Sequence, residues 1–422
     1  MTDVLDPLID ATFKGYPHGA VPLHRSRIGD QGWNVLAGDL PLPLAVIRRD
    51  ALAHNVGWMQ GLADAAGVRF APHGKTTMSP QLFRRQLDAG AWGLTFATVT
   101  QMQAGLAAGA RNVLIANQVL DAADLGAIAA LHDTHPDVRV VFLLDSQQQL
   151  ALIEAVSVER PFDVLLEVGV AGGRTGVRAH DAALALARRA HASEAVNLAG
   201  LECYEGLGNT GRSEEDGPAA AALMDRLERL AIQCDAEGLF DVDEVVVSAG
   251  GSGVFDLVVP RLRLALSRPV MGLLRSGCYV THDHGHYQRL VHAANRRLGC
   301  GDAQGLRAAL EVWALVQSMP EPGLAILTVG KRDISHDLGM PVPLATCARA
   351  SRERRAVPEG WAIQKLNDQH AYLHLTSDTH GLQVGDRVCL GISHPCTTFD
   401  KWRWMPVVDD GYTVVDAIVT CF

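Results

Sequence analysis

The sequence predicts an α/β protein in which a (β/α)8 barrel of the TIM type precedes an all-β domain. From about residue 42 to residue 250, apolar strand-like runs alternate with alanine- and leucine-rich stretches of helical period. Eight such runs over about 210 residues match the size of a barrel, and a doubly wound open sheet is the alternative. After about residue 287 the runs become short, and Gly, Pro and Asp separate them. This change of rhythm predicts a second domain made of strands.

The expected elements can be placed in chain order from these patterns. Barrel strands are expected at Pro43–Ile47, Val68–Ala71, Gly93–Ala97, Asn112–Ala116, Val138–Leu144, Val164–Val168, Leu198–Tyr204 and Glu244–Ser248. Helical period between them is clearest at residues 101–108, 182–192 and 219–237. Strands of the β domain are expected at Leu310–Val316, Leu324–Val329, Ala371–Leu375, Arg387–Ile392 and Thr413–Val419. We therefore expect an N-terminal segment at 1–40 that joins the β domain, a barrel at 41–284 and a β domain at 285–422.

The bulk composition argues against several classes of protein. With 48% hydrophobic and 20% charged residues, the chain has ample material for a globular core. A formal net charge of −10 argues against a nucleic-acid or anionic-membrane partner, and no apolar run reaches the roughly 18 residues of a membrane span. The acidic start does not resemble a signal peptide. The eight cysteines form no C-x-x-C pair, so we expect free thiols in a cytoplasmic protein.

Lys75 is the first candidate for a catalytic residue. The apolar run Val68–Ala71 ends just before Pro72-His73-Gly74-Lys75, as a strand ends in a turn. Barrel enzymes carry out their chemistry at the carboxyl ends of the strands, so a lysine there points into the active site. Burial would lower the pKa of its amine and free it for Schiff-base chemistry. A solvated surface lysine is the alternative interpretation.

A glycine-rich loop follows the last expected barrel strand. It reads Ser248-Ala249-Gly250-Gly251-Ser252-Gly253. Clustered glycines let backbone amides approach an anion closely, and loops after the late strands of barrels commonly bind phosphate. The loop therefore predicts a phosphate site, with a simple flexible turn as the alternative.

Two clusters of histidine and cysteine suggest a metal. In His394-Pro395-Cys396, the two ligands at positions i and i+2 of an extended chain share one face, and both suit Zn²⁺. Two protein ligands would leave positions open for substrate, which is typical of a catalytic site. A packed cysteine is the commoner outcome for such a pattern. The run His282-Asp283-His284-Gly285-His286 lacks the further ligands of a hydrolase site and is more often solvated or substrate-facing.

Two further candidates lie at expected strand ends. Tyr204, in Leu201-Glu202-Cys203-Tyr204-Glu205-Gly206, either faces the barrel mouth or packs in the core, because strand alternation permits both. Arg174, in Gly172-Gly173-Arg174-Thr175-Gly176, is suited to bind a carboxylate or an anionic ring oxygen, and a surface arginine is the alternative.

Taken together, these segments resemble the fold-type III pyridoxal-phosphate enzymes, in particular the group of D-serine dehydratase and D-threonine aldolase. The similar segments lie in the same order along the chain at 72–76, 167–177, 200–206, 248–253, 275–279 and 394–396. The resemblance covers roughly residues 40–422. It implies a barrel of the alanine racemase N-terminal type with a C-terminal β domain.

The resemblance also implies roles for single residues. Lys75 would hold pyridoxal 5'-phosphate as a Schiff base and would act in catalysis with Tyr204 and Arg174. The residues around the cofactor would be His73, Lys75, Arg174, Tyr204, Gly250, Gly251, Ser252, Gly253 and Tyr279. His394 and Cys396 would bind Zn²⁺. Dehydratases of this group pair histidine with cysteine and aldolases pair it with aspartate, so Cys396 favours a dehydratase.

The implied reaction is β-elimination from a D-hydroxy amino acid, with D-serine giving pyruvate and ammonia. Lys75 would remove the α-proton, the cofactor would delocalise the charge, and zinc would help the hydroxyl leave. Retro-aldol cleavage and racemisation are the alternatives. Thr77 stands where the family often has a histidine, which leaves the substrate contacts near Lys75 open. A homodimer is expected by analogy.

Two interpretations from other classes compete with this one. A non-catalytic pyridoxal-phosphate-binding protein would resemble the barrel alone, and the long region after Tyr287 argues against it. A zinc hydrolase built on His282, His284 and His286 would leave Lys75 without a role.

Overall fold

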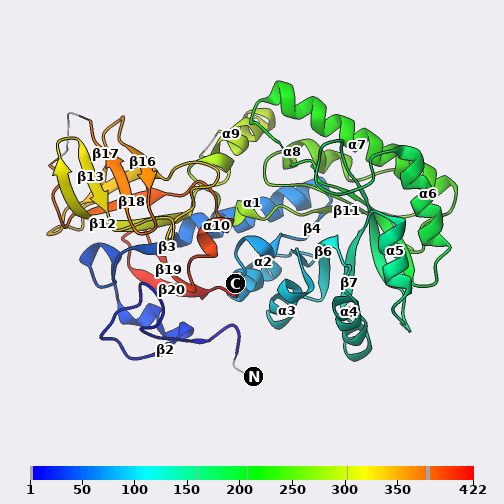
Figure 1. Ribbon diagram of the computed structural model, residues 1–422, viewed down its shortest axis with the longest axis horizontal. Coiled ribbons are helices and arrows are strands. Elements are labelled where there is room, and N and C mark those ends of the chain that lie inside the picture. Colours follow the sequence, from blue (N-terminus) through cyan, green and yellow to red (C-terminus); the bar gives the residue numbers. More distant parts are fainter. Residues whose placement is uncertain (1–2, 158, 207, 302, 377–380) are drawn as a thin grey trace.

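A sheet of eight parallel strands organises the larger part of the molecule, which we describe from a computed structural model (Figure 1). The structure describes residues 3–157, 159–206, 208–301, 303–376 and 381–422. The strand order is β4-β11-β10-β9-β8-β7-β6-β5. The two edge strands meet, because His73 and Thr95 form a parallel bridge and the Trp92 amide donates to the Phe70 carbonyl at 2.8 Å. The sheet therefore closes, and the absence of an order reversal among these strands excludes the doubly wound alternative.

Helices alternate with these strands and cover the outside of the sheet (Figure 1). The strands are β4 (Arg69–Phe70), β5 (Leu94–Phe96), β6 (Asn112–Gln118), β7 (Arg139–Leu144), β8 (Phe162–Val168), β9 (Val196–Cys203), β10 (Val245–Ala249) and β11 (Val270–Leu274). The helices are α1 (Arg49–Ala66), α2 (Pro80–Asp88), α3 (Val99–Ala107), α4 (Ala122–Thr134), α5 (Gln147–Glu154), α6 (His180–His191), α7 (Ser213–Ala236) and α8 (Phe255–Val258). Side chains of Thr98, Asp121 and Ser146 cap the first turns of α3, α4 and α5.

The structure differs from the predicted barrel at two strands. One expected barrel strand belongs to the β domain, and one observed barrel strand was not predicted. The run at Pro43–Ile47 forms β3 (Leu44–Arg48), which pairs with strands of the β domain. An unbroken apolar run indicates a strand buried on both faces, and it does not indicate in which sheet. The eighth barrel strand is instead β11, which carries Gly272 because a Cβ there would lie 2.8 Å from the Cβ of Leu262. The glycine-rich loop consequently follows the seventh barrel strand, β10.

The interior of the barrel is a separate apolar cluster. It consists of Ala71, Leu114, Val141, Leu143, Leu165, Ala199, Val246, Met271 and Leu273. These side chains fill the barrel, and the alternate residues of the strands face the helices in the main core. The barrel is thus solid, and a binding site can form only at its end.

The second domain is antiparallel except for the parallel pair β3 and β19, and it lies beside the barrel (Figure 1). Its strands are β3, β12 (Leu310–Glu321), β13 (Leu324–Leu327), β14 (Val342–Cys347), β15 (Arg355–Ala356), β16 (Ala362–Leu366), β17 (Ala371–His374), β18 (Arg387–Gly391), β19 (Trp404–Val408) and β20 (Val414–Val419). Helix α9 (His286–Leu298) leads into it from the barrel, and the short α10 (Cys396–Phe399) follows β18. The expectation of a C-terminal all-β domain is confirmed.

The N-terminal segment contains a two-stranded ribbon, β1 (Leu8–Ile9) with β2 (Leu23–His24). Downstream of this ribbon, Arg25 forms an ion pair with Asp416 of β20 at 2.6 Å, and Asn34 forms an antiparallel bridge with Thr413. Both contacts connect the segment to the β domain.

Two further expectations concern the whole chain. Among the described residues, no helix combines the length and the apolar character needed to cross a membrane. All eight cysteines are free thiols.

Candidate active site

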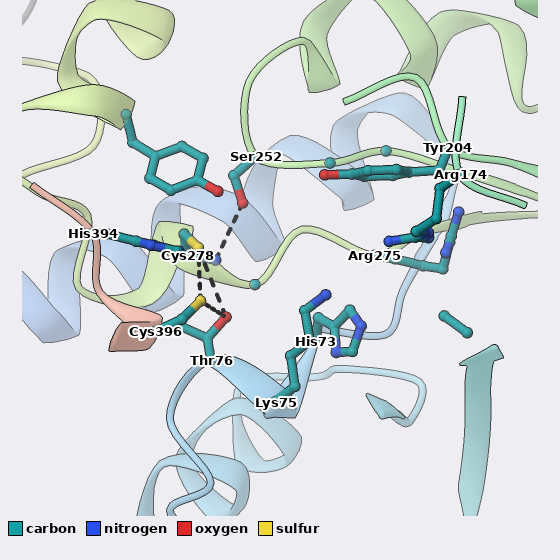
Figure 2. Close-up of a pocket in the computed structure, with 15 residues that line it drawn as sticks. His73, Lys75, Thr76, Arg174, Tyr204, Ser252, Arg275, Cys278, His394 and Cys396 are labelled. Atoms are coloured by element: carbon teal, nitrogen blue, oxygen red, sulfur yellow. Dashed lines mark hydrogen bonds between the residues drawn. The ribbon is translucent and has the colours of Figure 1, made fainter. Parts of the chain in front are cut away.

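A cavity of about 260 Å³ lies at the carboxyl end of the barrel strands, where the β domain meets the barrel (Figure 2). Residues from both domains line it: His73, Lys75, Thr76, Ala116, Arg174, Tyr204, Gly250, Gly251, Ser252, Arg275, Gly277, Cys278, Tyr287, His394 and Cys396. The cavity therefore collects most of the residues that the sequence singled out.

Lys75 reaches the cavity from a short 3-10 helix, η4 (Gly74–Thr76), in the turn after β4. The turn is fixed between neighbouring strands, because the Thr95 amide donates to the Pro72 carbonyl at 3.0 Å. Gly74 is required here: a Cβ would lie 2.5 Å from the ring of Phe96. Figure 2 shows Lys75 between the cysteine pair on one side and Tyr204 on the other.

The surroundings of Lys75 favour its neutral amine. Burial lowers the pKa of Lys75, the nearby Cys396 and Cys278 sulfurs oppose that shift, and the cations of Arg174 and Arg275 add to it. A lysine with a lowered pKa loses its proton more readily, and its neutral amine is a nucleophile and a base.

Tyr204 and Arg174 form the opposite wall of the cavity. The Arg174 guanidinium lies 5.1 Å from the centroid of the Tyr204 ring, a cation–π contact. Burial, followed by the Glu205 carboxylate, raises the pKa of Tyr204 to about 12, so its hydroxyl stays protonated. Of the two orientations that strand alternation allowed for Tyr204, the structure has the one that lines the cavity.

A buried ion pair supports this wall from below the strand ends. Arg275 donates to Glu202 at 2.5 Å and to the Cys203 carbonyl at 2.8 Å. Burial raises the pKa of Glu202 to about 7, although Arg275 acts in the opposite direction. The Nε atom of Arg275 and the Nδ1 atom of His73 are buried and have no partner among the described residues. Both residues line the cavity and can therefore donate to, or accept from, a polar ligand in it.

The glycine-rich loop binds an anion, but the anion is a side chain. The amides of Gly250 and Gly251 donate to the Glu205 carboxylate at 3.0 and 2.6 Å. These two donors are consequently occupied, and the prediction that they bind phosphate is not supported in this structure. Ser252 lines the cavity, and its hydroxyl accepts from the Cys278 amide at 3.1 Å. Gly253 packs against Leu290 instead of lining the cavity.

Tyr279 is placed wrongly by the sequence argument. Its ring packs against Phe70 with the centroids 5.2 Å apart, and its hydroxyl accepts from Gln86 at 2.9 Å. It lies in η6 (Cys278–Val280), where successive side chains point in different directions, so Cys278 faces the cavity and Tyr279 faces the core.

The predicted metal pair lies on the β-domain side of the cavity. His394 lies between β18 and α10, and Cys396 is the first residue of α10; Pro395 between them is helical (φ −61°, ψ −48°), not extended as expected. Asp337 accepts from the Nδ1 atom of His394 at 2.6 Å. That contact leaves Nε2 available to a metal. Among the described residues, one group of three potential ligands converges, Cys278 with His394 and Cys396.

The histidine run at 282–286 does not line the cavity that contains Lys75. His282 and His284 line a separate cavity of about 900 Å³ beside α9. Burial lowers the pKa of His282 to about 3 and that of His284 to about 4. Within the described chain these histidines form no metal-ligand cluster, which removes the structural basis of the zinc-hydrolase interpretation.

Several residues of the site escaped the sequence argument. Arg275 and Cys278 lie in the segment 275–279, for which the resemblance implied a role for Tyr279 alone. Glu202, Glu205 and Asp337 act through contacts with residues far along the chain, so no local pattern could have found them.

The barrel, the β domain and a buried lysine at a strand end define the class of pyridoxal-phosphate proteins whose barrel resembles alanine racemase. The chain belongs to the alanine racemase N-terminal domain family, which matches residues 47–272, more than half of its length, and thus to the fold-type III pyridoxal-phosphate family. Residues 309–408 match a second family, described as "Putative serine dehydratase domain".

Curated relatives cover most of the chain. It is 27% identical over 362 residues to D-threonine aldolase of an Arthrobacter species, covering 85% of this chain and 86% of the relative. It is also 27% identical over 374 residues to D-threo-3-hydroxyaspartate dehydratase of Delftia sp. (strain HT23), covering 85% and 92%. Among solved structures, D-threonine aldolase from Filomicrobium marinum has a TM-score of 0.76 at 24% identity, over 92% of this chain and 97% of the other. At this level of identity, the similarity shows that the two proteins share a fold.

Proposed function

We propose that the protein is a pyridoxal-phosphate- and zinc-dependent lyase that eliminates the β-hydroxyl of a D-hydroxy amino acid, with D-serine as the expected substrate. The observation that carries the proposal is the shared cavity: the Lys75 amine and the pair His394 and Cys396 line the same 260 Å³ space. A base and a Lewis acid can therefore act on one small substrate. The curated relatives, all lyases of D-hydroxy amino acids by name, support this substrate class.

The residues present fit the cofactor. A buried lysine with a lowered pKa, the unpaired Arg275 Nε and His73 Nδ1 atoms, and the polar wall at Ser252 suit an aldehyde-bearing, anionic ring. Bound pyridoxal phosphate supplies an electron sink for the charge that remains when a proton leaves the α-carbon. Lys75 and Tyr204 would hold it from opposite sides, and Ser252 would take part in binding its phosphate.

The protein's own groups divide the proton chemistry. Burial, with Arg174 and Arg275, lowers the pKa of Lys75, and its Nζ atom can accept the α-proton when it is neutral. Tyr204 stays protonated, so its hydroxyl donates a hydrogen bond and does not compete as a base. Its stacking on Arg174 holds the guanidinium inside the cavity, where it can orient a carboxylate.

The metal pair fits zinc. Nε2 of His394 and the sulfur of Cys396 are borderline and soft donors, and Asp337 orients the imidazole. Zinc bound there supplies a Lewis acid for a hydroxyl oxygen. A solved structure of a D-threo-3-hydroxyaspartate dehydratase with a cysteine-to-alanine substitution is described as the metal-free form.

Retro-aldol cleavage is the second candidate. The relatives named D-threonine aldolase and 3-hydroxy-D-aspartate aldolase favour it as strongly as the dehydratase favours elimination. Cysteine at position 396 is the feature that leads us to elimination, because the resembling aldolases use aspartate there.

The test is a panel of D- and L-serine, threonine and 3-hydroxyaspartate, with and without a chelator. Keto acid and ammonia from a D-amino acid support elimination, and glycine with an aldehyde supports cleavage. Lys75→Ala serves as the inactive control. Turnover of L-amino acids only, or full elimination in metal-free protein, would refute the proposal.

A homodimer is part of the proposal. Leu338 and Met340, both exposed, lie at the rim of the 900 Å³ cavity and offer apolar surface to a second chain. Light scattering behind size exclusion distinguishes a dimer from a monomer.

A further inference from the structure

Cys278 comes from the barrel and meets the predicted metal pair of the β domain. Its sulfur lies 3.6 Å from that of Cys396, and the ligand atoms of Cys278, His394 and Cys396 all lie within 4.8 Å of one another. Figure 2 shows the three side chains converging on the side of the cavity next to Lys75. Thr76 contacts both sulfurs, at 3.8 Å to Cys278 and 3.5 Å to Cys396.

The backbone holds Cys278 firmly in this place. Gly277 lies against the turn that carries Lys75, so that a Cβ on Gly277 would be 2.8 Å from the His73 carbonyl and the Thr76 hydroxyl. The Cys278 amide donates to Ser252 at 3.1 Å. The sulfur is therefore positioned by the barrel itself.

The spacing of the two sulfurs agrees with a shared tetrahedral zinc. With Zn–S bonds of about 2.3 Å and a tetrahedral angle, two thiolates on one zinc lie about 3.8 Å apart. The observed separation is 3.6 Å. A disulfide requires about 2.05 Å, so the cysteines are two thiols facing a common point.

We propose that Cys278 is a third protein ligand of the metal, which gives a Cys2His site with one position open towards Lys75. This inference rests on the metal of the proposed function. Three protein ligands and one open position are the usual composition of a catalytic zinc site, whereas the predicted His–Cys pair alone has only two ligands. Two thiolates also neutralise Zn²⁺ and select it against Mn²⁺ and Mg²⁺, which prefer oxygen ligands.

X-ray absorption at the zinc edge of the full-length holoenzyme tests the proposal directly, because it counts sulfur neighbours. We expect two sulfurs at about 2.3 Å in the wild type and one in Cys278→Ala and Cys278→Ser. Zinc affinity, measured by chelator competition, should fall by more than about 100-fold in both variants, beyond the loss caused by an outer partner. The matched control is Cys234→Ala, a buried cysteine of α7 far from the site, which should keep two sulfurs and wild-type affinity.

The possible outcomes distinguish the ligand role of Cys278 from the presence of the zinc itself. One sulfur in the zinc-loaded wild type would overturn the role of Cys278 and leave the metal in place. A protein that carries no zinc and is fully active would overturn both. Loss of two titratable thiols in the zinc-loaded, unreduced enzyme, restored by reductant, would show a disulfide and would also overturn the ligand role. The visible absorbance of the cofactor in each variant confirms that the barrel site is intact.

Discussion

Asp337→Asn should weaken zinc binding without disturbing the cofactor. Asp337 accepts from Nδ1 of His394 at 2.6 Å and from the Thr397 hydroxyl at 2.7 Å. Although burial acts in the opposite direction, the hydrogen bonds from Thr397 and His394 hold the pKa of Asp337 below its usual range, so it is a carboxylate at neutral pH. The amide keeps the shape and loses the charge that fixes the imidazole.

The expected loss follows from the exposure of the contact. Mutation of a residue that hydrogen-bonds to a metal ligand typically lowers metal affinity by about 10- to 100-fold, or about 1.4 to 2.8 kcal/mol. The Asp337 side chain is 41% exposed and solvent screens its charge, so the lower end, about tenfold, applies. Chelator competition measures the affinity, and excess zinc should restore turnover of D-serine, because binding rather than chemistry is impaired.

Asp400→Asn is the matched control. Asp400 follows α10 and its side chain is 43% exposed, but it contacts Lys401 instead of a metal ligand. Unchanged zinc affinity in Asp337→Asn, or an equal loss in Asp400→Asn, would refute the reasoning. An activity loss that excess zinc does not restore would show that Asp337 acts in the chemistry.

The remaining predictions concern the cofactor, the metal and acid stability. Lys75→Ala should lose the visible absorbance of the cofactor and all activity, and a borohydride-reducible adduct in the variant would assign the cofactor to another residue. In Gly251→Val the new Cβ would lie 2.9 Å from the Tyr204 ring, so cofactor retention should fall at least about tenfold, and unchanged affinity in a dialysis titration would contradict this. Cys396→Ala should lose zinc and elimination while keeping the visible band, and metal analysis beside D-serine turnover checks both. His282 has its pKa lowered by burial to about 3 from 6.5, so the unfolded chain binds its proton first and stability falls as the pH drops from about 6.5 towards 3. Asparagine tolerates the positive φ of 49° at this position, so His282→Asn should lose less stability than the wild type between pH 7 and pH 4.5 in thermal melts. An equal loss of stability in both proteins would contradict the assignment to His282.

The sequence was most informative where the signal is local. Alternation of apolar runs predicted seven of the barrel strands, and the turn at Pro72–Lys75 predicted a lysine at a strand end. The pair His394 and Cys396 was predicted to share one site, and both line the cavity, although Pro395 between them is helical and not extended as expected. Each of these inferences needs only the geometry of a few successive residues.

Inferences that needed a distant partner were the ones that failed. Residues 43–47 were recognised as a strand and assigned to the wrong sheet, because β3 pairs with β12, more than 260 residues later in the chain. The amides of Gly250 and Gly251 were predicted to bind an anion, and they do, but the anion is the Glu205 carboxylate instead of a phosphate. Tyr279 was recognised as part of a motif, but whether it faced the cavity depended on the packing of Phe70 and Gln86.

The amino-acid sequence by itself therefore determined the two-domain architecture, the family resemblance and the identity of Lys75, His394 and Cys396 as candidates. Only the tertiary structure decided that Cys278 lies 3.6 Å from Cys396, across 118 residues and a domain boundary, and that Asp337 orients His394 across 57. The physical reason is that hydrophobic pattern states whether a side chain is buried, whereas its neighbours are set by the packing of whole elements against each other. A metal site built from two domains exists only once that packing is complete.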